Sequence, residues 1–327
     1  MLTSDSKKGL RMKEKYLVTG GSGFIGSNLI EKIISQGADV VIVGKHPIIE
    51  RPENTSGIVK FYQGDVTDYD FMTELLVNEK FDYIILLAAD ISISNTVHHP
   101  LDTHLINEDA VLTTFEIIRK NNLKVRKVLF TSSSAVYGNL SSEPRSEKSP
   151  VCLENPYAID KFSSERYALF YDTVYNIPTV VVRFFNVFGP RQRAYGKSSG
   201  VCAIILDCLL YDKEFFLYGD GRQTRDYLYV DDATDAMMLL LKSTEVKGEV
   251  FNVAAGQSVS LIDLIALFEK IMGKKLKIVQ SAQKEFDAKD SLADISKINK
   301  IGFKPKYSLE SGLRQYIRIE RKRLGLK

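Results

Sequence analysis

A glycine-rich segment near the start constrains the fold of this chain more than any other feature. Residues 20–26 read GGSGFIG and directly follow KYLVT (15–19), an apolar stretch with the length of a buried strand. Apolar residues then recur at helical spacing over 29–34. Glycines between a strand and a helix allow a tight turn and let backbone N–H groups approach a pyrophosphate at the helix N-terminus. We therefore predict a dinucleotide-binding strand–loop–helix unit, with a merely tight turn as the plain alternative.

Strands and helices alternate through the residues that follow. Apolar runs predict further strands at 39–43, 58–63, 83–89, 128–132 and 179–185. Helical patterns begin at Asp68 and cover 106–120 and 157–174. Nearly continuous Val, Ile and Leu runs between helices are typical of a parallel sheet that helices cover on both faces. The predicted fold class is therefore α/β, with a doubly wound parallel sheet of the Rossmann type.

The alternation weakens after about Gly189, where shorter elements and loops rich in Tyr and Arg follow. A chain of 327 residues is also too long for one small core. We predict a dinucleotide-binding Rossmann domain over 12–187, to which the chain returns at about 228–255. Residues 188–227 and 256–327 are predicted to form a smaller α/β substrate-binding domain.

Composition argues against several classes of function. The net charge is only +3 and the basic residues form no stripe, so we expect no nucleic-acid partner. No apolar run reaches the ~18 residues that a membrane helix needs. Residues 1–15 lack the apolar centre of a signal peptide, so we expect a cytoplasmic protein without a membrane partner. The three cysteines form no C-x-x-C motif, and the four histidines have no Cys or second His group at ligand spacing, so no metal site is expected.

The residues after the second and third predicted strands bear on the choice of cofactor. A carboxylate after the second strand would bind the adenosine ribose of NAD, but this chain has Gly44 and Lys45 there. Lys45 is placed either to face the 2′-phosphate of NADP or to lie in solvent while NAD binds through other groups. Asp65, after the third strand, is placed to accept from the adenine amino group or to cap a turn. NAD and NADP are both open at this point.

The candidate catalytic residues lie near the middle of the chain. Tyr157 and Lys161 stand four residues apart in a predicted helix and therefore share a face. A nearby ammonium favours the phenolate and lowers the pKa of a tyrosine, which suits Tyr157 to moving a proton to or from a sugar hydroxyl. Ser133 follows the fifth predicted strand, whose carboxyl end should face the cofactor crevice.

Several motifs together resemble those of the extended short-chain dehydrogenase/reductases, and within them the nucleotide-sugar epimerase/dehydratase group typified by UDP-glucose 4-epimerase. The resemblance covers about residues 15–316. The motifs that support it are TGGSGFIG (19–26), GDV (64–66), LAA (87–89), TSSSAVYG (131–138), NPYAIDK (155–161), RFFNVFGPRQ (183–192), YGDGRQTRDYLYVDD (218–232) and SLADISK (291–297). The chain departs from the group's usual pattern at Leu86 and at Lys289-Asp290.

The resemblance implies roles for the matching residues. Tyr157 is implied to be the catalytic base, Lys161 its pKa partner and a ribose ligand, and Ser133 a second hydroxyl contact. The implied cofactor-binding residues are Gly20, Gly23, Phe24, Ile25, Gly26, Lys45, Asp65, Val66, Leu87, Ala88, Ala89 and Phe185. The implied substrate-binding residues are Ser133, Ala135, Asn186, Val201, Arg225 and Lys289. Arg225 suits a diphosphate, with an ion pair to Asp226 or Asp232 as its plain alternative, and Asp232 is expected to pin a loop. A homodimer is also implied, through helices such as 106–120 and 157–174.

The residues after Ser133 separate the activities within this group. Dehydratases usually carry an Asp–Glu pair where this chain has Ser134 and Ala135, and neither of these can act as a general acid or base. The resemblance then implies a nucleotide-sugar 4-epimerase of the UDP-hexose type, which works by hydride transfer at sugar C4 through a 4-keto intermediate, with NAD as cofactor. The alternative is an NADPH-dependent reductase of a nucleotide-linked 4-keto-6-deoxy sugar, which Lys45 favours. A non-catalytic dinucleotide-sensing protein is disfavoured because Tyr157 and Lys161 are both present.

Overall fold

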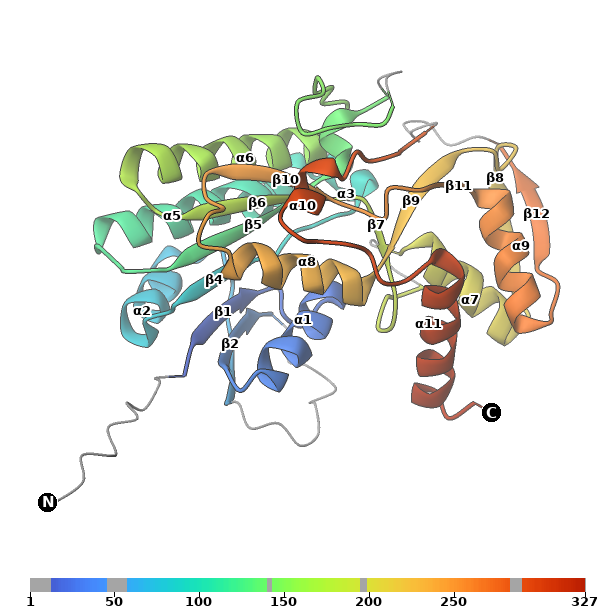
Figure 1. Ribbon diagram of the computed structural model, residues 1–327, viewed down its shortest axis with the longest axis horizontal. Helices are drawn as coiled ribbons and strands as arrows, with labels where there is room; N and C mark the ends of the chain where they lie inside the picture. The colour runs from blue at the N-terminus through green and yellow to red at the C-terminus, as the bar shows by residue number, and fades with distance from the viewer. Residues whose placement is uncertain (1–12, 46–57, 140–142, 195–198, 283–289, 327) are drawn as a thin grey trace, which may run out of the picture.

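Seven strands form one sheet in the computed structural model, which describes residues 13–45, 58–139, 143–194, 199–282 and 290–326 (Figure 1). Their order is β10-β6-β5-β4-β1-β2-β3, and each neighbouring pair is parallel. The strands are β1 (Lys15–Thr19), β2 (Asp39–Gly44), β3 (Val59–Gln63), β4 (Tyr83–Leu86), β5 (Lys127–Ser133), β6 (Thr179–Phe184) and β10 (Glu249–Val253). The order reverses between β1 and β4, which is where sheets of this kind bind ligands. The predicted doubly wound α/β fold is confirmed.

Helices cover both faces of this sheet. They are α1 (Phe24–Ser35), α2 (Tyr69–Glu79), α5 (Ala110–Lys120), α6 (Pro156–Tyr175) and α8 (Val230–Lys242). Apolar side chains of α1 and α8 share one core with the sheet, whereas those of α2, α5 and α6 share another. Figure 1 shows α1 and α8 side by side on one face and α5 and α6 together on the other. The side chains of β1, β2, β4, β5 and β6 are buried on both faces, which explains why these sequences are mostly continuous apolar runs, whereas the edge strand β3 is partly exposed.

A smaller part of the molecule has its own core. It contains β7 (Asn186–Phe188), β8 (Glu214–Tyr218), β9 (Thr224–Tyr229), β11 (Ser258–Ser260) and β12 (Lys277–Ser281), with helices α7 (Val201–Tyr211), α9 (Leu261–Met272) and α11 (Leu309–Arg323). β11, β9 and β7 form one sheet and β12 pairs with β8. Between these elements the chain returns to the large sheet through α8 and β10, and α10 (Ser296–Lys300) packs beside β10. We propose that the separate core marks the predicted substrate-binding domain.

Two elements differ from their predicted extents. β4 ends at Leu86 rather than at residue 89. Beyond it the Thr19 hydroxyl accepts the backbone N–H groups of Leu87 and Ala88 at 3.2 and 3.3 Å, and Leu87 shares its N–H with the Thr19 carbonyl oxygen. The predicted helix 106–120 is the end of a longer broken run. α3 (Ile93–His98), α4 (Pro100–His104) and a π-helical turn, η1 (Leu105–Asp109), lead into α5. Side-chain periodicity does not reveal a π turn, because one turn adds only a single residue.

Within the part of the chain that the structure describes, none of the helices is both long and apolar enough to cross a membrane.

Candidate active site

The glycine loop between β1 and α1 has no room for a side chain at Gly20 or Gly26. A Cβ atom on Gly26 would lie 2.5 Å from the Gly20 carbonyl oxygen, and one on Gly20 would lie 2.8 Å from the Ala88 nitrogen. Gly20 also has φ +68°, a conformation that favours glycine. No side chain caps the N-terminus of α1, where Gly23 is the N-cap. Backbone N–H groups at a helix start with no side-chain cap suit a pyrophosphate, so the loop fits the dinucleotide predicted from the sequence.

Lys45 and Asp65 form an ion pair at the carboxyl ends of β2 and β3. The Lys45 ammonium lies 2.7 Å from Asp65 Oδ2, and the Lys45 side chain is exposed whereas that of Asp65 is half-buried. Asp65 Oδ1 also accepts the Thr67 backbone N–H at 3.1 Å. Both residues therefore lie where the adenosine half of a dinucleotide binds in this fold. The pair is compatible with either role predicted for Lys45.

The fold brings Ser133, Tyr157 and Lys161 together. Ser133 ends β5, and its hydroxyl, which accepts the Ala135 backbone N–H at 3.2 Å, lies close enough to the Tyr157 phenol to lower the pKa of that phenol. Tyr157 and Lys161 lie in α6, whose N-cap Asn155 accepts the Ala158 backbone N–H at 2.9 Å. The Lys161 ammonium donates to the Thr131 carbonyl oxygen at 2.9 Å and lies 6.0 Å from the centre of the Tyr157 ring. All three residues sit near the carboxyl end of β5, as the sequence predicts.

Burial, rather than Lys161, dominates the pKa of Tyr157. Burial raises the pKa of this phenol to about 12, and the hydrogen bond from Ser133 offsets only part of the increase. Burial also lowers the pKa of Lys161 to about 8, although the nearby Asp160 carboxylate opposes that change. The expected lowering of the Tyr157 pKa by Lys161 is therefore wrong for the protein alone. The Lys161 ammonium is directed to the Thr131 carbonyl rather than to the phenol oxygen.

The remaining predicted substrate contacts come from both parts of the molecule. Ala135 lies in the 3₁₀ turn η2 (Ser134–Tyr137) after β5, and Val201 begins α7. Asn186 begins β7, and Arg225 in β9 donates to the Thr224 carbonyl oxygen at 2.7 Å. Lys289 lies outside the described residues. The next residue, Asp290, accepts from the Thr224 hydroxyl at 2.8 Å, so this segment reaches β9 beside Arg225.

The carboxylates of Asp226 and Asp232 both accept hydrogen bonds from backbone N–H groups of segments distant in sequence. Asp226 is buried and accepts the N–H groups of Ala255 and Gly256 at 2.8 and 2.9 Å. Asp232 accepts those of Lys306 and Tyr307 at 2.9 and 3.1 Å. Asp232 therefore pins a loop, as the sequence predicts. Phe185, the residue predicted to border the nicotinamide, is buried between β6 and β7.

Two buried anchors of the site were not predicted from the sequence. Asn107 exchanges hydrogen bonds with the backbone of Asp90 at 2.9 and 3.0 Å, and its own carbonyl accepts from the Ser164 hydroxyl at 2.9 Å. It thereby ties the segment after β4 to α6. In the second anchor, Arg183 donates to both oxygens of Glu165, at 2.9 and 2.5 Å, which fixes α6 to β6. The partners in each anchor are far apart in sequence, and no periodic pattern links them.

Comparison with known proteins identifies the family. The profile of the NAD dependent epimerase/dehydratase family matches residues 16–254. The UDP-glucose 4-epimerase of Mycolicibacterium smegmatis is 32% identical over 314 residues, which cover 94% of this chain and 98% of that protein. This chain therefore belongs to the NAD dependent epimerase/dehydratase family.

Solved structures agree with this assignment. A UDP-glucose 4-epimerase from Thermotoga maritima with UDP-glucose has a TM-score of 0.89 and 32% identity, covering 95% of this chain and 99% of that one. The complex of the Thermus thermophilus UDP-glucose 4-epimerase with NAD has a TM-score of 0.85 and 27% identity, covering 94% and 99%. The likeness extends over both parts of the molecule, not only over the large sheet.

Proposed function

We infer that this protein is an NAD-dependent nucleotide-sugar 4-epimerase of the UDP-hexose type. The observation that carries this inference is the placement of Ser133, Tyr157 and Lys161 beside a glycine loop that fits a dinucleotide. Ser134 and Ala135 occupy the positions at which a dehydratase usually carries two acids, so the chain lacks a proton donor and acceptor pair there. The similar M. smegmatis and T. maritima proteins bear the name UDP-glucose 4-epimerase.

Tyr157, Ser133 and Lys161 have different roles in the proposed reaction. Tyr157 takes the proton of the sugar 4-hydroxyl and later returns it to the 4-oxygen. Ser133, whose hydroxyl lies near the phenol, orients the same oxygen. Lys161, held by the Thr131 carbonyl, adds positive charge beside the phenol. Bound NAD supplies the oxidation of C4 and the reduction of the resulting 4-keto sugar, and its positively charged ring further favours the phenolate.

The dinucleotide released on denaturation tests this function. We expect the purified protein to release about one NAD per chain, because an epimerase recycles its cofactor without exchanging it. The control is the Gly26→Ala variant, whose methyl group would meet the Gly20 carbonyl oxygen and is expected to leave the protein depleted of dinucleotide. A protein that is purified empty and binds NADPH in preference to NADH would instead support the reductase.

The cytoplasmic location expected from the sequence stays a prediction.

Replacing Lys45 tests its part in cofactor choice. Lys45→Asp removes the cation and sets a second carboxylate beside Asp65, which disfavours a 2′-phosphate and provides an acceptor for ribose hydroxyls. We expect the ratio of NADP to NAD affinity to fall by about tenfold, measured by fluorescence titration of the emptied protein. Lys124→Asp is the matched control, since Lys124 is exposed just before the amino end of β5, whereas Lys45 follows the carboxyl end of β2. An unchanged ratio would show that Lys45 does not face the 2′-phosphate.

We propose that the protein is a homodimer that pairs through α6 and the helices beside it. Four exposed apolar side chains of α6 fall at i, i+8, i+11 and i+15 and therefore share one face: Ile159, Tyr167, Phe170 and Val174. Leu101 and Leu105, at the neighbouring α4 and η1, are also exposed. Contiguous apolar surface of this kind marks an interaction site.

The dimer is tested by light scattering after size-exclusion chromatography. We expect the wild type to have twice the chain mass and Ile159→Asp to have the mass of one chain. Ile278→Asp is the control, because Ile278 in β12 is 47% exposed against 48% for Ile159 and lies in the smaller part of the molecule. A wild type of single-chain mass would refute the proposed pairing.

A further inference from the structure

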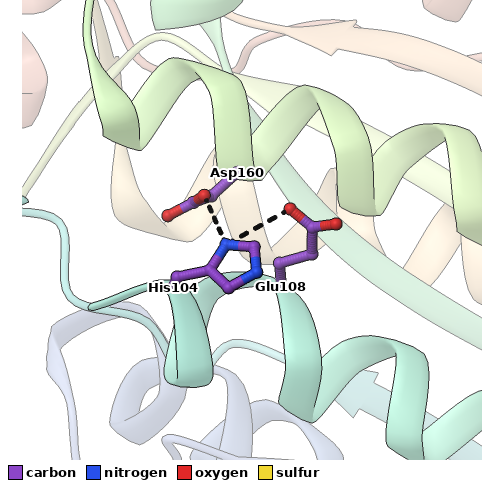
Figure 2. A group of neighbouring side chains, drawn as sticks. All are labelled: His104, Glu108 and Asp160. Carbon is purple, nitrogen blue, oxygen red and sulfur yellow. Dashed lines mark hydrogen bonds and ion pairs between the residues drawn. The ribbon is translucent and has the colours of Figure 1, made fainter. Parts of the chain in front are cut away.

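Three side chains with metal-binding atoms meet between α6 and the helical run before α5. Figure 2 shows His104 from the end of α4, Glu108 from the π turn η1, and Asp160 from α6. His104 Nδ1 lies 2.9 Å from Asp160 Oδ1 and 3.5 Å from Glu108 Oε2. One ligand atom from each of the three residues lies within 4.8 Å of the other two. The three side chains of this cluster are distinct from the Ser133, Tyr157 and Lys161 side chains, although Asp160 precedes Lys161 in α6.

Negative charge is in excess at this cluster. Asp160 is only 4% exposed, and its second oxygen, Oδ2, has no hydrogen-bond partner among the described residues. Glu108 accepts from the Ser163 hydroxyl at 2.7 Å, a neutral donor. A third carboxylate, Asp109, lies 3.7 Å from His104 Nε2. The adjacent ammonium of Lys161 is directed to the Thr131 carbonyl. A buried carboxylate needs a compensating positive charge, and a metal ion held by these three side chains would supply one.

We propose that His104, Glu108 and Asp160 bind a divalent transition-metal ion of the Zn²⁺ class. Zinc bonds to imidazole nitrogen and carboxylate oxygen are about 2.0–2.2 Å long, which sets neighbouring ligand atoms of a tetrahedral ion about 3.4 Å apart. The observed separations of 2.9 and 3.5 Å bracket that value, so side-chain movements of a few tenths of an ångström admit the ion. One nitrogen and two oxygen ligands favour Zn²⁺ over Mg²⁺ or Ca²⁺, which prefer oxygen alone.

The ion would have a structural role and would take no part in the reaction at the sugar. It would join α4 and η1 to α6, the helix that carries Tyr157 and Lys161. Protons compete with the metal for His104, whose pKa is raised by its hydrogen bond to Asp160 and by the charges of Glu108 and Asp109. Metal affinity therefore falls as the pH falls through that raised pKa. Sequence spacing did not reveal the site, because Asp160 lies 56 residues from His104.

The test is a calorimetric titration of the purified protein with Zn²⁺ after dialysis against EDTA. We expect one ion per chain, a higher midpoint of thermal unfolding, and no comparable binding of Mg²⁺. His104→Gln and Asp160→Asn should each weaken Zn²⁺ binding by about tenfold or more. His99→Gln is the matched control, because His99 is exposed beside α4 and outside the cluster, and it should bind Zn²⁺ as the wild type does.

Co²⁺ gives a second measurement that does not depend on the folding of any variant. The wild type with one Co²⁺ should show the absorption of nitrogen and oxygen ligation, without a thiolate charge-transfer band. That band would place the ion on Cys152 or another cysteine and overturn the proposal. Binding that is unchanged in both His104→Gln and Asp160→Asn would mean an adventitious ion only, and the absence of saturable Zn²⁺ binding would also refute the site.

Discussion

Tyr157→Phe is expected to lower the kcat of UDP-hexose epimerisation by about 10²- to 10⁴-fold, the usual contribution of a positioned acid–base group. The substitution removes the hydroxyl and leaves the buried ring in place. The NAD content of the purified variant and its midpoint of thermal unfolding should therefore stay close to those of the wild type. Activity is measured by a coupled assay with the protein's own bound cofactor.

Tyr167→Phe provides the matched control for this prediction. Tyr167 lies in the same helix, α6, but its side chain is exposed, whereas that of Tyr157 is buried. We expect this variant to keep wild-type turnover. If Tyr157→Phe also kept wild-type turnover, the assignment of Tyr157 as the acid–base group would be wrong.

Arg183→Met is expected to destabilise the protein by about 3–5 kcal/mol, because it leaves a buried charge without its partner. Arg183 donates to both oxygens of Glu165, which is 1% exposed, and also to the Tyr137 hydroxyl at 2.9 Å. The loss is measured as the change in the free energy of unfolding in urea. Activity should fall as well, since this pair fixes the helix that carries Tyr157.

Two further variants show whether the loss comes from the uncompensated charge. In Arg183→Met/Glu165→Leu both charges are gone, and replacing a whole buried pair by apolar groups is often neutral, so much of the stability should return. Arg314→Met breaks the exposed pair with Glu310 and should cost less than about 1 kcal/mol. A loss below about 1 kcal/mol for Arg183→Met itself would contradict the account of this anchor.

The large sheet was predictable because each of its strands leaves a local pattern. β1, β2, β4, β5 and β6 are buried on both faces and therefore appear as apolar runs, and the glycine loop fixes where the first helix begins. The end of β4 and the π turn η1 were not predictable. The first depends on the Thr19 hydroxyl, which lies in another strand, and the second on backbone hydrogen bonding.

The candidate site was predictable in its residues but not in its electrostatics. The Y-x-x-x-K spacing and the carboxyl end of β5 are visible in the sequence, so Ser133, Tyr157 and Lys161 were found together. The pKa of Tyr157 could not be predicted from the sequence, because it depends on how completely the folded chain buries the phenol. The ion pair of Lys45 with Asp65 is likewise a product of the fold, since it joins the ends of β2 and β3.

A UDP-hexose that carries deuterium at C4 tests most directly whether the protein is a 4-epimerase that recycles its NAD. It is incubated with the purified protein and no added dinucleotide. NMR spectroscopy of the products follows both the configuration at C4 and the label. We expect a mixture of the two C4 epimers in which deuterium is retained at C4 of the inverted sugar, because the same bound cofactor takes and returns it. Absence of inversion, or conversion only when NADPH is added in stoichiometric amount, would contradict a 4-epimerase that recycles its NAD.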